Sequence, residues 1–361
     1  MTRRSDEISD DEWDRFVHSC PGGNIEQTSS WAQLKGHYGW ESHRVVYRRN
    51  GEIEGGAQLL LRRANYIGPI AYLARGPLVR ADDPVAMRGT VDEIELAARK
   101  LNVVYLVIAP PFEGASPEEE LRARGFVLKP HALPPSKVPV ATPITDLSPS
   151  LDELLQGASR VVRRSIKKAA ASPLSFRRGA EHEVDTFRSL MYQLCQRRGD
   201  TPAPPQRDFF DKAWQHLGES GLARVYLAEL DGEPVSAVFV FTFNHSFQLW
   251  KAGWSGAHKK HCPNHFLYWE MIKTAKREGF DKFDQIQILP QHASLLKRGE
   301  RPEGPYSGVT NFKMSWGAEI HSSPPVMAKS YRTMSQAFVR AGGLDLIAKT
   351  GNWRILSRLK W

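Results

Sequence analysis

A run of basic residues between Glu153 and Glu181 is the most concentrated chemical feature of the sequence. The interval contains no acidic residue but holds several basic ones: Arg160, Arg163, Arg164, Lys167, Lys168, Arg177 and Arg178. On a helix spanning 159–170, the basic side chains three or four positions apart repel one another by roughly 0.2–0.5 kcal/mol per pair. Because a phosphate backbone relieves this repulsion, the pattern predicts contact with nucleic acid through residues 160–168. The alternative is a solvated helix face that packs through Val161, Val162 and Ile166.

Two further groups of side chains could bind a metal ion or a phosphate. His258, His261, Cys262 and His265 are possible zinc ligands by type, but their spacing matches no common zinc motif and Pro263 interrupts them. We therefore expect no metal, and a loop before a helix starting near 266. Arg207 follows Pro202, Pro204 and Pro205, and its guanidinium could clamp a phosphate with paired hydrogen bonds. An ordinary loop arginine fits that position equally well.

Cofactor-binding signatures are missing from the sequence. There is no Q/R-x-x-G-x-G/A string of the kind that holds the pyrophosphate of acetyl-CoA, and neither a P-loop nor a Rossmann fingerprint. We expect no cofactor, so an activated substrate must arrive ready-made.

The composition of the chain limits which classes of protein it can belong to. The chain has 361 residues, 41% hydrophobic and 25% charged, which indicates two folded domains, and its formal charge of +9 favours a polyanionic partner. No apolar run approaches the roughly 20 residues of a membrane-spanning helix, which leaves peripheral membrane contact as an open question. The acidic N-terminal stretch and three widely separated cysteines predict a cytoplasmic protein without disulfides. The oligomeric state is left open.

The positioning elements occur twice in the same order. Residues 44–61 and 224–241 each read as strand, two-residue turn and strand, with Asn50-Gly51 and Asp231-Gly232 as turns 181 residues apart. After each hairpin come a helix (91–100; 268–279), a strand (103–108; 282–289), a short helix (118–125; 308–317) and a closing strand (126–128; 318–320). We predict an α+β protein with two tandem domains of the GNAT acyltransferase type and mixed, mostly antiparallel sheets.

Proline and serine mark the crossing between the two copies. The stretch 110–149 is rich in both, which places the boundary near Thr145. We expect domain 1 at 1–145, domain 2 at 146–317, and the segment 318–361 packing back on domain 1 with a helix at 330–340.

An ordered set of short strings resembles the Fem family, whose members move an amino acid from aminoacyl-tRNA to a peptide amine. The strings are Gln27-x-x-x-Trp31-x-x-x-Lys35, Gly39-Trp40, Arg75-Gly76-Pro77, the basic helix with Ile166-Lys167-Lys168-Ala169, Asp231-Gly232, Ala252-Gly253, and Phe312-Lys313-x-x-Trp316-Gly317. The resemblance covers about residues 24–322 and is closest to the compact FemX-type layout.

The resemblance implies roles for individual residues. Lys313 would stabilise the oxyanion formed when an amine attacks an aminoacyl ester, with Phe312 walling the site. Lys35 would hold a phosphate of the acceptor, with Trp31 beside it. A solvated lysine is the alternative for both cations, and core filling for Phe312.

The Asp284 segment departs from the family pattern. Fem proteins carry a D-x-x-G here, whereas this chain reads Asp284-Gln-Ile-Gln-Ile, so Asp284 is assigned to a substrate site whose acceptor side differs. The predicted acceptor is a peptidoglycan precursor; the alternatives are a small amine in antibiotic biosynthesis and a non-catalytic RNA-binding module. A CoA-dependent acyltransferase is a further rival. By type, Asp281 and Asp284 are both candidate general bases.

Overall fold

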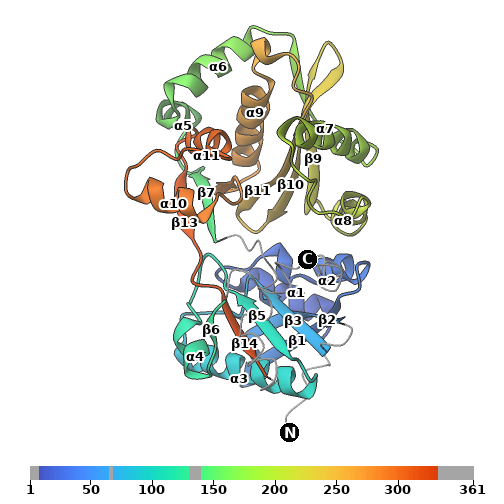
Figure 1. Ribbon diagram of the computed structural model, residues 1–361, viewed down its shortest axis with the longest axis vertical. Coiled ribbons are helices and arrows are strands. Elements are labelled where there is room, and N and C mark those ends of the chain that lie inside the picture. Colours follow the sequence, from blue (N-terminus) through green and yellow to red (C-terminus); the bar gives the residue numbers. More distant parts are fainter. Residues whose placement is uncertain (1–7, 65–67, 130–139, 332–361) are drawn as a thin grey trace. The chain divides into compact units, whose positions relative to one another are not determined.

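The computed structural model describes residues 8–64, 68–129 and 140–331. The chain divides into two compact units: unit 1 comprises Met1–Val140 with Ser323–Trp361, and unit 2 comprises Ala141–Ser322 (Figure 1). No helix among the described residues combines the length and the apolar character needed to cross a bilayer.

Unit 1 is a seven-stranded mixed sheet with helices on both faces. Its helices are α1 (Asp10–Ser19), η2 (Ile25–Gln27), α2 (Ser29–Gly36), α3 (Pro84–Lys100) and α4 (Glu118–Ala123). Its strands are β1 (Glu41–Arg49), β2 (Glu52–Ala64), β3 (Gly68–Ala74), β4 (Leu78–Val79), β5 (Tyr105–Ala109), β6 (Val127–Leu128) and β14 (Met327–Ser330). The order is β1-β2-β3-β5-β14-β6 with β4 on β2, and all pairs are antiparallel except β3 with β5.

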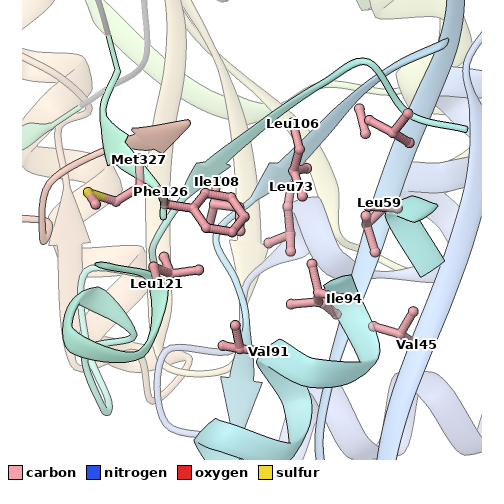
Figure 2. Close-up of a cluster of buried hydrophobic side chains, with 14 of the residues drawn as sticks. Val45, Leu59, Leu73, Val91, Ile94, Leu106, Ile108, Leu121, Phe126 and Met327 are labelled. Carbon is pink, nitrogen blue, oxygen red and sulfur yellow. The ribbon is translucent and has the colours of Figure 1, made fainter. Parts of the chain in front are cut away.

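Two adjacent glycines in β2 show how close the helices lie to this sheet. A Cβ at Gly55 would come 2.0 Å from Thr90 of α3, and one at Gly56 would come 2.9 Å from Trp13 of α1. Because successive residues of a strand face opposite sides, α3 and α1 cover opposite faces. On the α3 side, Ile94 and Val91 pack against Leu59, Leu73 and Ile108 (Figure 2).

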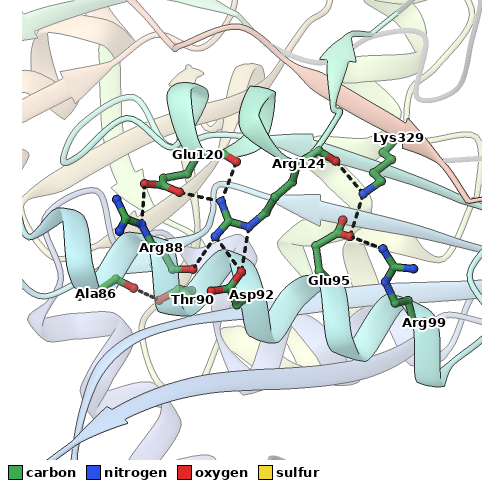
Figure 3. Close-up of polar contacts among 9 residues, drawn as sticks. All are labelled: Ala86, Arg88, Thr90, Asp92, Glu95, Arg99, Glu120, Arg124 and Lys329. Atoms are coloured by element: carbon green, nitrogen blue, oxygen red, sulfur yellow. Dashed lines mark hydrogen bonds and ion pairs between the residues drawn. The ribbon is translucent and has the colours of Figure 1, made fainter.

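The last described strand of unit 1 returns from the far end of the sequence. Met327 to Ser330 pair with β5, and Met327 joins the core on the α3 side. The carboxylate of Glu95, on α3, anchors this strand, because it accepts hydrogen bonds from Lys329 Nζ at 2.7 Å and from the Tyr331 hydroxyl at 2.6 Å. Arg99 is its third partner (Figure 3).

Replacing Glu95 with alanine is expected to lower the free energy of unfolding by about 2–4 kcal/mol, because Lys329 would keep a largely buried charge without its carboxylate. The matched control is Glu118→Ala, which removes an exposed ion pair with Arg122 and should cost less than about 1 kcal/mol. Urea titration of both variants measures the difference; equal losses would show that the Glu95 pair does not anchor β14.

Unit 2 repeats the plan with a second seven-stranded sheet. Its helices are α5 (Leu151–Gly157), α6 (Arg160–Ala170), α7 (Glu183–Arg198), α8 (Phe209–Leu217), η3 (Lys259–His261), α9 (Pro263–Arg277), α10 (Pro290–Lys297) and α11 (Ser307–Met314). Its strands are β7 (Ala141–Asp146), β8 (Leu174–Arg178), β9 (Ala223–Leu230), β10 (Glu233–Phe243), β11 (Ser246–Trp254), β12 (Lys282–Asp284) and β13 (Glu319–Ser322). They lie in the order β13-β7-β12-β11-β10-β9-β8, and only β11 and β12 are parallel.

Both predicted hairpins are confirmed. The turn residues Asn50 and Gly51 have φ of 54° and 87°, and Asp231 and Gly232 have 53° and 85°, the left-handed pair that a two-residue hairpin turn requires. In unit 2 the two faces of the sheet are filled by different helices. Phe239 packs on Phe187 of α7, whereas Phe247 lies on the α9 side.

The structure differs from the sequence-based expectations at three places. β7 pairs with β12 and β13, so residues 141–145 and 319–322 belong to the sheet of unit 2, and not to the first domain as expected. The expected strand 282–289 ends at Asp284, because Ile286 has a left-handed backbone. Residues 332–340 of the expected C-terminal helix lie outside the described residues.

Candidate active site

The parallel strands β11 and β12 share only three paired positions, Ser246–Gln248 with Lys282–Asp284. Beyond them β12 stops, whereas β11 continues to Trp254 paired with β10 alone. The register between β10 and β11 shifts after Phe239, and Trp250 is the extra residue of this bulge because it has no partner in β10. The sheet therefore loses its β11–β12 pairing just beyond Asp284.

Asp284 occupies the point where the pairing ends. Its buried carboxylate accepts hydrogen bonds from Gln248 Nε2 at 2.9 Å, from the Ile286 N–H at 2.7 Å and from the Thr142 hydroxyl. These three donors come from β11, β7 and the following loop, so Asp284 fixes the start of that loop. Its role as a substrate ligand stays a prediction.

The loop after Asp284 is bent by an unfavourable residue. Ile286 has φ of 58°, and a left-handed conformation costs a residue with a Cβ about 1–2 kcal/mol. The bend turns the carbonyl oxygens of Ile286 and Gln287 toward Lys313, whose Nζ donates to them at 3.0 and 2.9 Å. The strained loop thus forms a cradle for one ammonium group.

Lys313 reaches this cradle from the last turn of α11. Partial burial of the side chain lowers the pKa of Lys313 to about 8; the charge of Asp284 opposes this shift, and the charges of Lys251 and Arg198 add to it. Gln285 braces the helix because its Nε2 donates to the Lys313 carbonyl at 3.0 Å. An ammonium group held in this way is a suitable partner for a developing oxyanion.

Phe312 belongs to a cluster of aromatic rings beside Lys313. Its ring centroid lies 4.9 Å from that of Tyr268, 5.1 Å from His265 and 6.0 Å from Trp316. Burial against these rings lowers the pKa of His265. The half-buried Phe312 can therefore both fill the core and wall the cradle, and the sequence alone could not separate these roles.

The histidines near α9 take separate roles. His261 Nδ1 lies 2.9 Å from Ser172 Oγ, while His265 faces the aromatic cluster. In the part of the chain that the structure describes, no three His, Cys, Asp or Glu side chains are grouped closely enough to hold a metal ion.

The basic helix forms as predicted and points its charges outward. The five basic residues are exposed: Arg160, Arg163, Arg164, Lys167 and Lys168. Val162 packs in the core with Ile166 at its edge, but Val161 is 66% exposed, so its expected place in the packing stripe was wrong. Arg163 differs from the others because its guanidinium donates to the carbonyls of Gln156 and Ala158.

Arg207 lies beside α7 and α8 in unit 2. The exposed residue precedes α8, and its carbonyl accepts a hydrogen bond from Arg188 of α7, which is also ion-paired with Asp211. Arg207, Arg188 and Asp211 line a shallow hollow with Tyr192. The described contacts of Arg207 are with α7 and α8 and do not include Asp284 or Lys313, so phosphate binding by Arg207 stays a prediction.

The remaining candidates, Trp31 and Lys35, stand on α2 in unit 1. Trp31 is buried, whereas Lys35 is half-buried with its Nζ 5.5 Å above the ring of Trp40. Burial lowers the pKa of Lys35 to about 8, the charge of Glu26 opposes this, and Arg62 adds to it. Arg62 lies over the same Trp40 ring at 5.8 Å, so two cations share one indole.

Sequence reasoning missed the residues that build the cradle. Gln248, Thr142 and Gln285 are distant in sequence and no local pattern distinguishes them. Arg198 and Lys251, whose charges act on Lys313, could have been noticed because acidic residues are absent from 186–199 and from 234–269.

Two family models each match a different part of the chain. Residues 8–120 match the model of the FemAB family, and residues 156–287 match an acetyltransferase (GNAT) domain. A Lipid II:glycine glycyltransferase of Staphylococcus aureus is 30% identical over 233 residues, covering 62% of this chain and 54% of the relative. The chain is thus similar to proteins of the Fem family. It spans about half the length of the curated relatives it matches.

Solved structures share the fold of this chain. A crystal structure of FemX superposes with a TM-score of 0.79 at 20% identity, covering 92% of this chain and 98% of that one. The structure of L-PGS from Bacillus licheniformis has a TM-score of 0.54 at 12% identity, covering 95% and 99%. The predicted resemblance to the Fem family and the predicted pair of GNAT-like units with mixed sheets are both confirmed.

Proposed function

We propose that this chain is an aminoacyltransferase that moves an amino acid from aminoacyl-tRNA to an amine, with a peptidoglycan precursor as acceptor. The observation that carries the proposal is the Lys313 ammonium held by the Ile286 and Gln287 carbonyls beside the end of β12. The staphylococcal relative, a Lipid II:glycine glycyltransferase, supports the reaction class and the acceptor.

The reaction requires the protein mainly to align the amine with the ester and to stabilise the negative charge that develops on the carbonyl oxygen. The acceptor amine attacks the ester carbonyl, the C–N bond forms, and the bond to the ribose oxygen breaks, while the proton lost by the amine ends on that oxygen. Lys313 offsets the negative charge on the carbonyl oxygen during the attack. Asp284 carries three internal hydrogen bonds and Asp281 is paired with His245, so we assign the general base to neither.

The donor is inferred from the charge of unit 2. Helix α6 presents five exposed cations, and none of them is ion-paired with another described residue, so a phosphate backbone would meet no competing carboxylate there. Aminoacyl-tRNA carries both a polyanionic backbone and an ester that is already activated. A donor of this kind needs no cofactor, which fits a chain without cofactor motifs.

The acceptor is tested by supplying labelled aminoacyl-tRNA with either a peptidoglycan precursor or a mixture of small amines. We expect the label to enter the precursor as one added residue. Label entering only the small amines would contradict the precursor and favour the antibiotic-type acceptor. The chain departs from the family's D-x-x-G at this point, because Gln287 stands where the family has glycine.

The pH dependence of the transfer should report on Lys313. With a pKa lowered to about 8, the ammonium loses its proton in mildly alkaline solution, so kcat is expected to fall as pH rises through about 8. In Lys313→Arg the cation persists, and whatever activity remains should stay level over pH 7–9.5. A wild-type rate that is unchanged over this range would show that the charge of Lys313 does not act in the reaction.

A further inference from the structure

Three stretches without acidic residues, 154–180, 186–199 and 234–269, lie together in unit 2. The end of α6 is tied to η3, since Ser172 Oγ lies 2.9 Å from His261 Nδ1. The end of α7 is tied to β11, because Arg197 lies over the ring of Trp254 at 5.2 Å. Three segments that are far apart in the sequence thus place their basic side chains close together, and none of the three contains an acidic residue.

Trp254 lies where these segments meet, with a cation from each of two segments near its ring. Lys259 Nζ lies 5.9 Å from the centroid of Trp254, the ring that Arg197 also covers. Gly256 makes room for this arrangement, because a Cβ there would come 2.6 Å from the Arg197 guanidinium. The two like charges on one ring repel each other, and an anion between or beside them would offset this repulsion.

The cations continue from this point toward Lys313. Arg198 follows Arg197 at the end of α7 and is exposed. Two residues on, Asp200 accepts a hydrogen bond from the Tyr306 hydroxyl at 2.6 Å, which ties this end of α7 to the start of α11, the helix that carries Lys313. Lys259 and Lys260 are exposed on η3, which contacts α6. Among the described residues, none of Arg197, Arg198, Lys259 and Lys260 forms an ion pair.

We propose that α6, Lys259, Lys260, Arg197 and Arg198 form one phosphate-binding surface, the basic track, which guides the acceptor end of aminoacyl-tRNA to Lys313. The inference rests on the proposed function for the identity of the donor. It adds η3 and the end of α7 to the basic helix, and it gives the RNA backbone a path from α6 to the cradle.

The test measures tRNA affinity against salt concentration for Lys259→Gln/Lys260→Gln. Removing one phosphate interaction reduces the slope of log K against log[salt] by about 0.9, so we expect a slope smaller by about 1.8 and binding roughly ten- to thirtyfold weaker at 0.15 M salt. Arg198→Gln should lose about half as much. The matched control Lys100→Gln/Lys297→Gln removes two exposed lysines outside the track and should bind like the wild type.

Transfer from aminoacyl-tRNA separates failure of the track from failure of the proposed function. A raised KM for aminoacyl-tRNA with the reduced slope supports the track. Wild-type slope and KM in Lys259→Gln/Lys260→Gln would overturn the track and leave the transferase function standing. A reduced slope with no transfer even by the wild type would support the track as an RNA-binding surface and reject the transferase.

Discussion

Replacing Lys313 with alanine is expected to lower kcat for aminoacyl transfer by about 10²- to 10³-fold, the usual cost of removing one oxyanion-stabilising group. The ammonium is the charged group that the Ile286 and Gln287 carbonyls hold at the end of β12, and alanine leaves the cradle without it. Affinity for tRNA should change by less than about twofold, because Lys313 is assigned to the ester carbonyl and not to a phosphate. Single-turnover kinetics with saturating aminoacyl-tRNA measures the chemical step.

Two further variants separate chemistry from folding. Lys297→Ala removes an exposed lysine of α10 and should keep the wild-type kcat. Lys313→Gln keeps a hydrogen-bond donor for the carbonyls without the charge, so it should unfold near the wild-type temperature and still lose kcat. A wild-type rate in either Lys313 variant would contradict the assigned role and favour a solvated lysine.

Neutralising three cations of α6 is expected to weaken tRNA binding by about 10²-fold at 0.15 M salt, with a salt slope smaller by about 2.7. The variant Arg164→Gln/Lys167→Gln/Lys168→Gln leaves Arg163 in place, because that guanidinium also holds the Gln156 and Ala158 carbonyls. It should not lower stability, since like charges on one helix face repel. Filter binding across a salt series gives both numbers.

The control for this variant removes the same charge elsewhere. Arg63, Lys100 and Lys297 are exposed, and the one ion pair among them, Arg63 with Glu41 at 3.9 Å, contributes little. The triple glutamine variant of these residues should bind tRNA like the wild type. Equal weakening in both variants would mean that the net charge of the chain, and not the α6 face, attracts RNA.

The parts of the fold that the sequence could predict are those with a local cause. Asn50-Gly51 and Asp231-Gly232 turn where they do because both residues of each pair tolerate positive φ. The basic helix could be delimited because Ser159 accepts a hydrogen bond from the Val162 N–H as its N-cap and the charges follow a helical period.

The parts that escaped prediction depend on distant partners. Residues 285–289 have the composition of a strand, but the Asp284 carboxylate binds the Ile286 N–H and bends the chain away from the sheet. Likewise, β7 joins unit 2 only because β12 and β13 lie on either side of it. Lys313 could be named from its family string, but its cradle is formed by residues whose sequence neighbours show no pattern.

The identity of the activated donor is tested by offering three donors to the same acceptor, with aminoacyl-tRNA as the donor that we expect. The purified chain is incubated with a peptidoglycan precursor and either intact charged tRNA, the same tRNA treated with RNase, or acetyl-CoA, and the mass of the precursor is followed. We predict a gain of one amino-acid residue with intact tRNA only. A gain of an acetyl group from acetyl-CoA, or no gain from intact tRNA that the protein demonstrably binds, would contradict the account.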